Sequence, residues 1–254
     1  MNTATTTGTV DWSMRTGGRL AAAERRRLVA DLARVHLGNA VGRLSLLAHL
    51  NSGRNAYVPP AHLVPPDSPL TRAATDAATR VLPPTLLNHS YRTYRFGRAL
   101  GTLDNIDVDA ELLFAAALLH DTGLTVASGS EDFTLTSARV ARDVAEQVGL
   151  STTATETLQT AITMHHSPRV TPAAGPVAYL LAAGAGADVA GLRSWALPPA
   201  MLADAVRDHP RAGFKAFFRQ AWADEAARVP GGRAWLLRRY GAFTAAIALA
   251  PFDE

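Results

Sequence analysis

The sequence has no cysteine among its 254 residues. This absence excludes a disulfide framework, thiolate metal sites and a cysteine nucleophile, so any metal must be bound by His, Asp or Glu. No apolar stretch is long enough to span a bilayer. The N-terminal residues lack the basic-then-apolar order of a signal peptide. We therefore expect a cytoplasmic protein with no membrane partner.

Long runs of charge are also missing. The formal net charge is +3, Lys215 is the only lysine, and the arginines are scattered apart from short clusters in 24–27 and 238–239. Short arginine clusters on helices are typical of solvated faces. We therefore expect a small-molecule substrate and no nucleic-acid partner.

The sequence contains no convincing alternating strand pattern of five or more residues and no repeat of fixed period. Its length is long for one domain but short for two. We predict an all-α protein with one core, made of a polar, mobile tail (1–20), an N-terminal helical extension (21–62) and a helical domain with C-terminal helices (63–254).

Apolar periodicity, helix caps and Gly or Pro boundaries predict the helices. Residues 21–50 read as one long helix or a broken pair, and a proline-rich connection covers 51–70. The other predicted helices lie in 68–82, 83–101, 107–121, 134–149, 153–166, 174–191, 198–210, 213–230 and 233–250.

Histidine and aspartate stand at the polar boundaries of four apolar helices. Taken singly, each has an ordinary explanation: a hydrogen-bonded core histidine, a helix cap followed by a turn, a solvated helix end, or an exposed aspartate. Taken together, imidazoles and carboxylates at one end of a helical bundle suit a metal site with nitrogen and oxygen ligands. The residues are His89, His120, Asp121, His165, His166 and Asp188.

The order His, His-Asp, Asp resembles the HD-domain superfamily, which consists of all-α metal-dependent enzymes. The match is closer to the cyanamide hydratase-like branch. The stretches that carry it lie within about residues 64–230 and are "PDSPLTRAATDAATRVLPPTLLNHSYRTYRFG", "AALLHDTGLT", "AITMHHSPRV", "GAGADVAG" and "HPRAGFKAFF". The resemblance implies an HD-domain helical bundle. It implies the metal ligands His89, His120, Asp121 and Asp188.

Two positions depart from the pattern of that branch. His166 occupies a threonine position, next to His165, which aligns with a family histidine. Thr134 stands where relatives carry an acid after the phenylalanine. Since adjacent helical residues point about 100° apart, only one of the two histidines is expected to face the ligands.

The resemblance implies one divalent transition metal, zinc first, with iron, manganese or cobalt as alternatives. Water activated by the metal would add to a small nitrile such as cyanamide. His165 is the candidate proton donor and His166 the second choice, because the pKa of histidine lies near operating pH. Asp121 is also a catalytic candidate, since a carboxylate oxygen that does not bind metal could orient the water.

Two other readings stay open. An HD-type phosphohydrolase would use the same ligands on a nucleotide or another phosphomonoester, with Arg92 as the cation for phosphate. A non-catalytic module would bind a small molecule or a partner helix at a vestigial site. The long helix predicted in 21–50 could pair with the same helix of another subunit in a homo-oligomer, and its pattern is equally compatible with packing within one chain.

Overall fold

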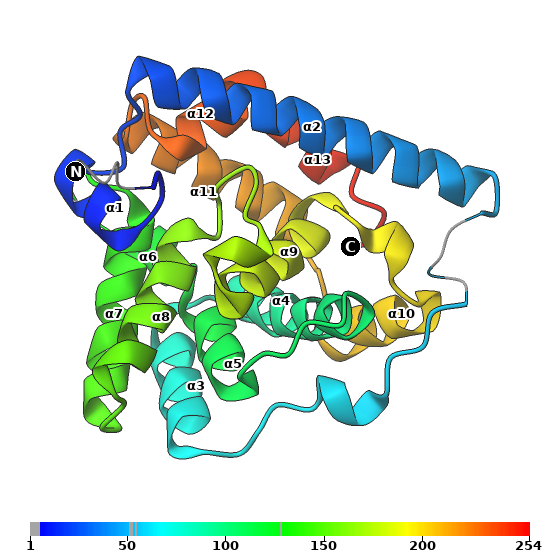
Figure 1. Ribbon diagram of the computed structural model, residues 1–254, viewed down its shortest axis with the longest axis horizontal. Coiled ribbons are helices and arrows are strands. Elements are labelled where there is room, and N and C mark those ends of the chain that lie inside the picture. Colours follow the sequence, from blue (N-terminus) through cyan, green and yellow to red (C-terminus); the bar gives the residue numbers. More distant parts are fainter. Residues whose placement is uncertain (1–5, 51–52, 54, 128) are drawn as a thin grey trace.

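The computed structural model describes residues 6–50, 53, 55–127 and 129–254. These residues form helices joined by short loops and include no strand; an isolated antiparallel bridge joins Arg19 and Gly232. The prediction of an all-α fold is confirmed. Figure 1 shows α2 as one long helix across one side of the molecule, above α11, α12 and α13.

The helices follow the predicted boundaries closely. The α-helices are α1 (Val10–Thr16), α2 (Ala22–Leu47), α3 (Pro69–Val81), α4 (Pro84–Leu103), α5 (Ala110–Leu119), α6 (Gly123–Val126), α7 (Phe133–Gln147), α8 (Thr152–Met164), α9 (Pro176–Ala190), α10 (Pro199–Asp208), α11 (Phe214–Arg228), α12 (Arg233–Tyr240) and α13 (Phe243–Ala248). The 3-10 helices with described bounds are η2 (Pro60–Leu63), η3 (Pro172–Ala174) and η4 (Ser194–Ala196).

The segment expected to be a mobile tail contains helix α1 instead. Thr9 caps this helix, and Trp12 is 1% exposed. The indole Nε1 of Trp12 donates to Glu24 at the start of α2 over 2.6 Å. The polar composition of this segment gave no sign of the contact. A single buried tryptophan with a hydrogen-bond partner is nevertheless enough to fix a short helix. Residues 1–5 of the predicted tail lie outside the described residues.

The helix predicted over 233–250 is two helices. Gly241 and Ala242 separate α12 from α13, and Ala242 has a φ of 46°. A left-handed residue interrupts helical hydrogen bonding. The break turns α13 back toward α9 and α11, which both contact it.

Helices α4 and α9 form the centre of the domain and bring two predicted site residues together. Their close approach depends on Gly97 and Gly184: a Cβ at Gly97 would lie 2.7 Å from the Leu180 carbonyl oxygen, and one at Gly184 would lie 2.2 Å from the Thr93 carbonyl oxygen. Any side chain at these positions would force the helices apart. The glycines thereby set the spacing between His89 on α4 and Asp188 on α9.

Among the described residues, no helix has the combination of length and apolar character needed to cross a membrane.

Candidate metal centre

Helix α5 carries the His-Asp pair to the middle of the protein. It is apolar on all sides and its last eight residues are buried, as expected for a helix surrounded by others. His120 is its C-cap, and the Nδ1 of His120 hydrogen-bonds the Ala117 carbonyl over 2.8 Å. This bond uses a carbonyl that the helix end leaves without a partner. It also places the proton on Nδ1, so Nε2 presents a lone pair.

His89 is held in the same protonation pattern by a different partner. Its Nδ1 lies 2.6 Å from Oδ2 of Asp188, an acceptor, so Nδ1 carries the proton. The Nε2 atoms of His89 and His120 lie 3.2 Å apart. Two bare nitrogen lone pairs at this distance repel one another unless a proton or cation lies between them.

Asp121 completes a triangle with these two nitrogens. Its Oδ2 lies 3.6 Å from Nε2 of His89 and 3.4 Å from Nε2 of His120. Both carboxylate oxygens are buried without a hydrogen-bond partner among the described residues. Ligand atoms at about 2.0–2.2 Å from a tetrahedral zinc lie about 3.3–3.6 Å from one another. The three residues therefore fit a divalent metal in spacing and in chemistry.

The protonation states also suit a metal. Burial is the main reason that the pKa of His120 is lowered to about 3, so this imidazole is neutral at neutral pH. Burial by itself would raise the pKa of Asp121, but His120, His165 and His89 together hold it well below its ordinary value. A neutral imidazole and an ionised carboxylate are the forms that bind a cation.

Asp188, the fourth ligand that the resemblance implies, lies beside this triangle and not in it. Its Oδ1 accepts from Nε of Arg92 over 2.7 Å and from Arg211, and its Oδ2 accepts from His89 and from Nη2 of Arg92 over 2.9 Å. Burial raises the pKa of Asp188, but Arg92 and Arg211 hold it far below its ordinary value. Each oxygen already has two donors, which match its two lone pairs. Asp188 thus contacts the ring of His89 through Nδ1, and the cluster of close ligand atoms contains His89, His120 and Asp121 without it.

His165 and His166 face different partners, as expected for adjacent residues whose side chains point about 100° apart. The Nδ1 of His165 hydrogen-bonds the Ile162 carbonyl over 2.7 Å at the end of α8, and its Nε2 lies 3.6 Å from Oδ1 of Asp121. His166 points to Asp132, with 3.5 Å between its Nε2 and Oδ2. Burial and then Arg233 lower the pKa of His166 to about 4. Only His165 contacts the metal triangle.

The sequence interpretation did not single out Arg211 or Asp132. Arg211 is 1% exposed and lies in "HPRAGFKAFF", where a lone arginine before an apolar helix was the available signal. Asp132 caps the N-terminus of α7. Its Oδ2 accepts a hydrogen bond from Nη2 of Arg233 over 3.0 Å, and its Oδ1 accepts one from the hydroxyl of Thr134 over 2.7 Å. A buried carboxylate therefore lies beside Thr134, but it belongs to Asp132, two positions earlier in the chain than the acid of the relatives.

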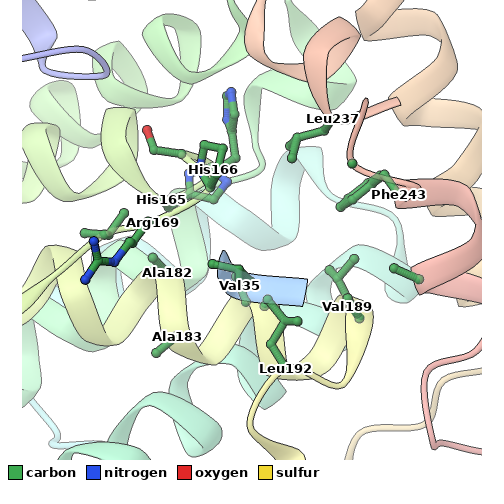
Figure 2. A pocket seen from close by; sticks show the side chains of 18 of the residues that line it. Val35, His165, His166, Arg169, Ala182, Ala183, Val189, Leu192, Leu237 and Phe243 are labelled. Atoms are coloured by element: carbon green, nitrogen blue, oxygen red, sulfur yellow. The ribbon is translucent and has the colours of Figure 1, made fainter. Parts of the chain in front are cut away.

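A cavity of about 520 Å³ opens from the triangle toward α2. Figure 2 shows Val35 reaching into it from α2, with His165 and His166 on one side and Ala182 and Val189 of α9 on another. Neither Arg92 nor Arg211 lines it. The metal triangle is therefore the polar end of a chamber with mostly apolar walls.

Comparison with known proteins gives one family. The profile of the HD domain family matches residues 86–212, which is half of the chain and includes all six predicted site residues. No curated protein matches the sequence. HD domains are usually metal-dependent hydrolases, which supports an enzyme with a divalent metal at the buried His-His-Asp cluster. The chain belongs to the HD domain family.

Proposed function

We propose that this protein is a divalent-metal-dependent enzyme, with zinc as the preferred ion, that adds water to the carbon–nitrogen triple bond of a neutral nitrile. One observation supports this choice above others. The His89, His120 and Asp121 cluster lies at the end of a cavity with mostly apolar walls, and Arg92 and Arg211, which lie beside His89, are engaged by Asp188. Such a site favours an uncharged substrate over an anion.

The proposed ligands are His89 and His120 through Nε2 and Asp121 through its carboxylate. A divalent cation held there would lower the pKa of a water molecule to near neutrality and so supply a nucleophile. The hydrogen bonds to Ala117 and Asp188 fix both imidazole rings and their tautomers. The proposed role of Asp188 is to position His89; direct metal binding by Asp188 stays a prediction.

His165 is the proposed proton donor. Its Nδ1 is engaged by Ile162, which leaves Nε2 as the atom that can exchange a proton at the centre. When water adds to the nitrile carbon, the nitrogen gains a proton and the oxygen loses one, and the product tautomerises to the amide. A proton carried on Nε2 of His165, next to Asp121, would reach that nitrogen.

His166 is the weaker catalytic candidate. It packs flat on Phe133, with ring centroids 5.1 Å apart, and faces Asp132 instead of Asp121. It still lines the cavity. We propose that it shapes the substrate space and does not transfer the proton.

The phosphohydrolase alternative is favoured by the family, since HD domains are usually hydrolases. It needs a cation that can meet phosphate beside the metal. Arg92, the cation first considered for this role, is fully buried, with Nε and Nη2 on Asp188 and Nη1 on the carbonyls of His209 and Pro210. Four of the five N–H groups of this guanidinium are thus engaged before any substrate enters.

A metal-loaded activity screen tests the proposal. The purified protein, loaded separately with zinc, iron, manganese or cobalt, would be given cyanamide and simple nitriles in one arm and phosphomonoesters in the other. We expect amide or urea formation and no release of phosphate. Phosphate release without nitrile turnover would refute the hydratase proposal, and a protein that holds no transition metal would favour the non-catalytic module.

A further inference from the structure

The cavity is much larger than cyanamide requires. Cyanamide has three non-hydrogen atoms, whereas cavities of roughly 300–1,000 Å³ enclose ligands of drug size. The cavity here measures about 520 Å³. The space beyond the metal triangle therefore needs another part of the substrate to fill it.

The walls of that space are apolar and come from several helices. Small residues on α9, among them Ala182, Ala183 and Gly186, keep the volume open, and Val35 of α2 faces them. Phe218, Trp222, Leu237 and Phe243 of α11, α12 and α13 form the remaining apolar side. Apolar walls of this kind favour an apolar ligand by excluding water from its surface.

The charged residues around the cavity do not change this conclusion. Arg34 pairs with Asp31 at 2.8 Å, and Arg193 pairs with Asp104 at 2.7 Å. Arg169 is solvent-exposed, and Figure 2 shows it on the opposite side of the cavity from Phe243. A charged substrate body would lie against uncharged walls over most of its length.

Helix α2 forms a fixed wall. Nε2 of His36 lies 2.7 Å from the Gly241 carbonyl, and Nη2 of Arg43 donates to the Ala190 carbonyl over 2.9 Å. Gly42 lies so close to Trp195 that a Cβ there would sit 2.0 Å from the indole Nε1. These contacts tie α2 to α9 and to the α12–α13 turn, so the cavity exists before a substrate enters.

We propose that the substrate carries an uncharged apolar body, which packs between Val35 of α2 and Ala182 of α9 while its reactive group meets the metal triangle. The inference rests on the proposed function only for the nature of that reactive group, a nitrile. Cyanamide would then be a poor substrate, because it leaves most of the cavity unfilled.

The test separates binding of the body from chemistry. Straight-chain primary amides from acetamide to hexanamide, the products of nitrile hydration, would be titrated calorimetrically into the zinc-loaded protein. We expect binding to tighten roughly fourfold per added methylene, which corresponds to about 0.8 kcal/mol. Affinity that does not change with chain length would overturn the proposal.

Matched variants on one helix locate the effect. Val35→Phe fills the cavity and should remove the gain from longer chains while acetamide binding is kept. Leu37→Phe, at an α2 residue that is 69% exposed, should leave the whole series unchanged. Ala182→Leu narrows the cavity from the facing helix α9. It replaces Val35→Phe in this test, with the same expected result, if Val35→Phe does not fold. Equal effects of the two α2 variants would contradict the proposed position of the body.

The corresponding nitriles distinguish the two proposals. Length-dependent amide binding without turnover of any nitrile would support the apolar body and refute nitrile hydration. Cyanamide turnover with length-independent amide binding would support hydration and overturn the apolar body.

Discussion

Residues 86–212, which match the HD domain family, supply the polar centre, whereas α2 and α11–α13, which lie outside the match, supply much of the apolar cavity wall. In the first region, hydrogen bonds fix the predicted ligands, and Asp188 has no free lone pair. In the second, side chains such as Val35 and Phe243 contribute shape alone. The polar centre therefore lies wholly within the matched residues, whereas the cavity wall is shared between α9, inside the match, and helices outside it.

The largest effect is expected from removal of a ligand. Asp121→Ala or His120→Ala should abolish tight zinc binding and activity, because each removes one corner of the triangle. Metal content by plasma mass spectrometry, measured beside activity, checks this. His62→Ala, at an exposed histidine outside the centre, is the control and should keep both. A metal-free Asp121→Ala protein with full activity would exclude this centre.

The next largest effect is expected at His165. His165→Ala should keep zinc but lower kcat by about 10²–10⁴, the usual contribution of a general acid or base. His166→Ala, which changes the neighbouring ring that faces Asp132, should cost less in kcat. Equal losses from both variants would argue against a separate proton donor. The measurement is the turnover rate at saturating substrate with the zinc content held equal.

Asp188 distinguishes a positioning residue from a ligand. Asp188→Asn should weaken zinc binding by about 10–100-fold, as expected when a partner of a metal-binding histidine is changed. It should also lower the free energy of unfolding by about 3–5 kcal/mol, because Arg92 and Arg211 lose a buried counter-charge.

Asp104→Asn is the matched control for that variant. Asp104 pairs with Arg193 and Tyr179 away from the triangle, so zinc affinity should not change. A loss at Asp188→Asn as complete as the loss at Asp121→Ala would show that Asp188 binds the metal directly.

The smallest effect is a pH dependence of stability from His166. Its folded-state pKa, about 4, is below the ordinary value of 6.5, so the unfolded chain takes up the proton first as the pH falls. Stability from this group is therefore complete above about pH 6.5 and declines toward pH 4, by about 2 kcal/mol between pH 7 and pH 5. Urea unfolding of the wild type and of His166→Phe checks this. The same pH dependence in both proteins would contradict a buried, neutral His166.

The local placement of the candidate ligands could be predicted better than their surroundings. The all-apolar helix before His120 and the amphipathic helix around His89 fixed the local positions of these ligands, because periodicity and caps act within a few residues. The partners of Asp188 were not predictable in the same way. Arg92 lies 96 residues from Asp188 and Arg211 lies 23 residues from it, and no local pattern shows that they converge.

The flanking helices show the same limit. The pairing of Trp12 with Glu24 and the left-handed Ala242 changed the expected tail and the last predicted helix. Both depend on contacts between distant elements, which override the local preference for coil or helix. The cavity could not be predicted at all, because residues of α2, α9 and α11–α13 line it together, and a sequence pattern does not show which helices face one another.

Anomalous diffraction at the zinc edge, from crystals of the zinc-loaded protein, tests the central claim most directly. We expect one peak about 2.0–2.2 Å from Nε2 of His89, Nε2 of His120 and an oxygen of Asp121, with Asp188 still bound to Arg92 and Arg211. Zinc-replete crystals that show no peak within ligand distance of these three residues would contradict it.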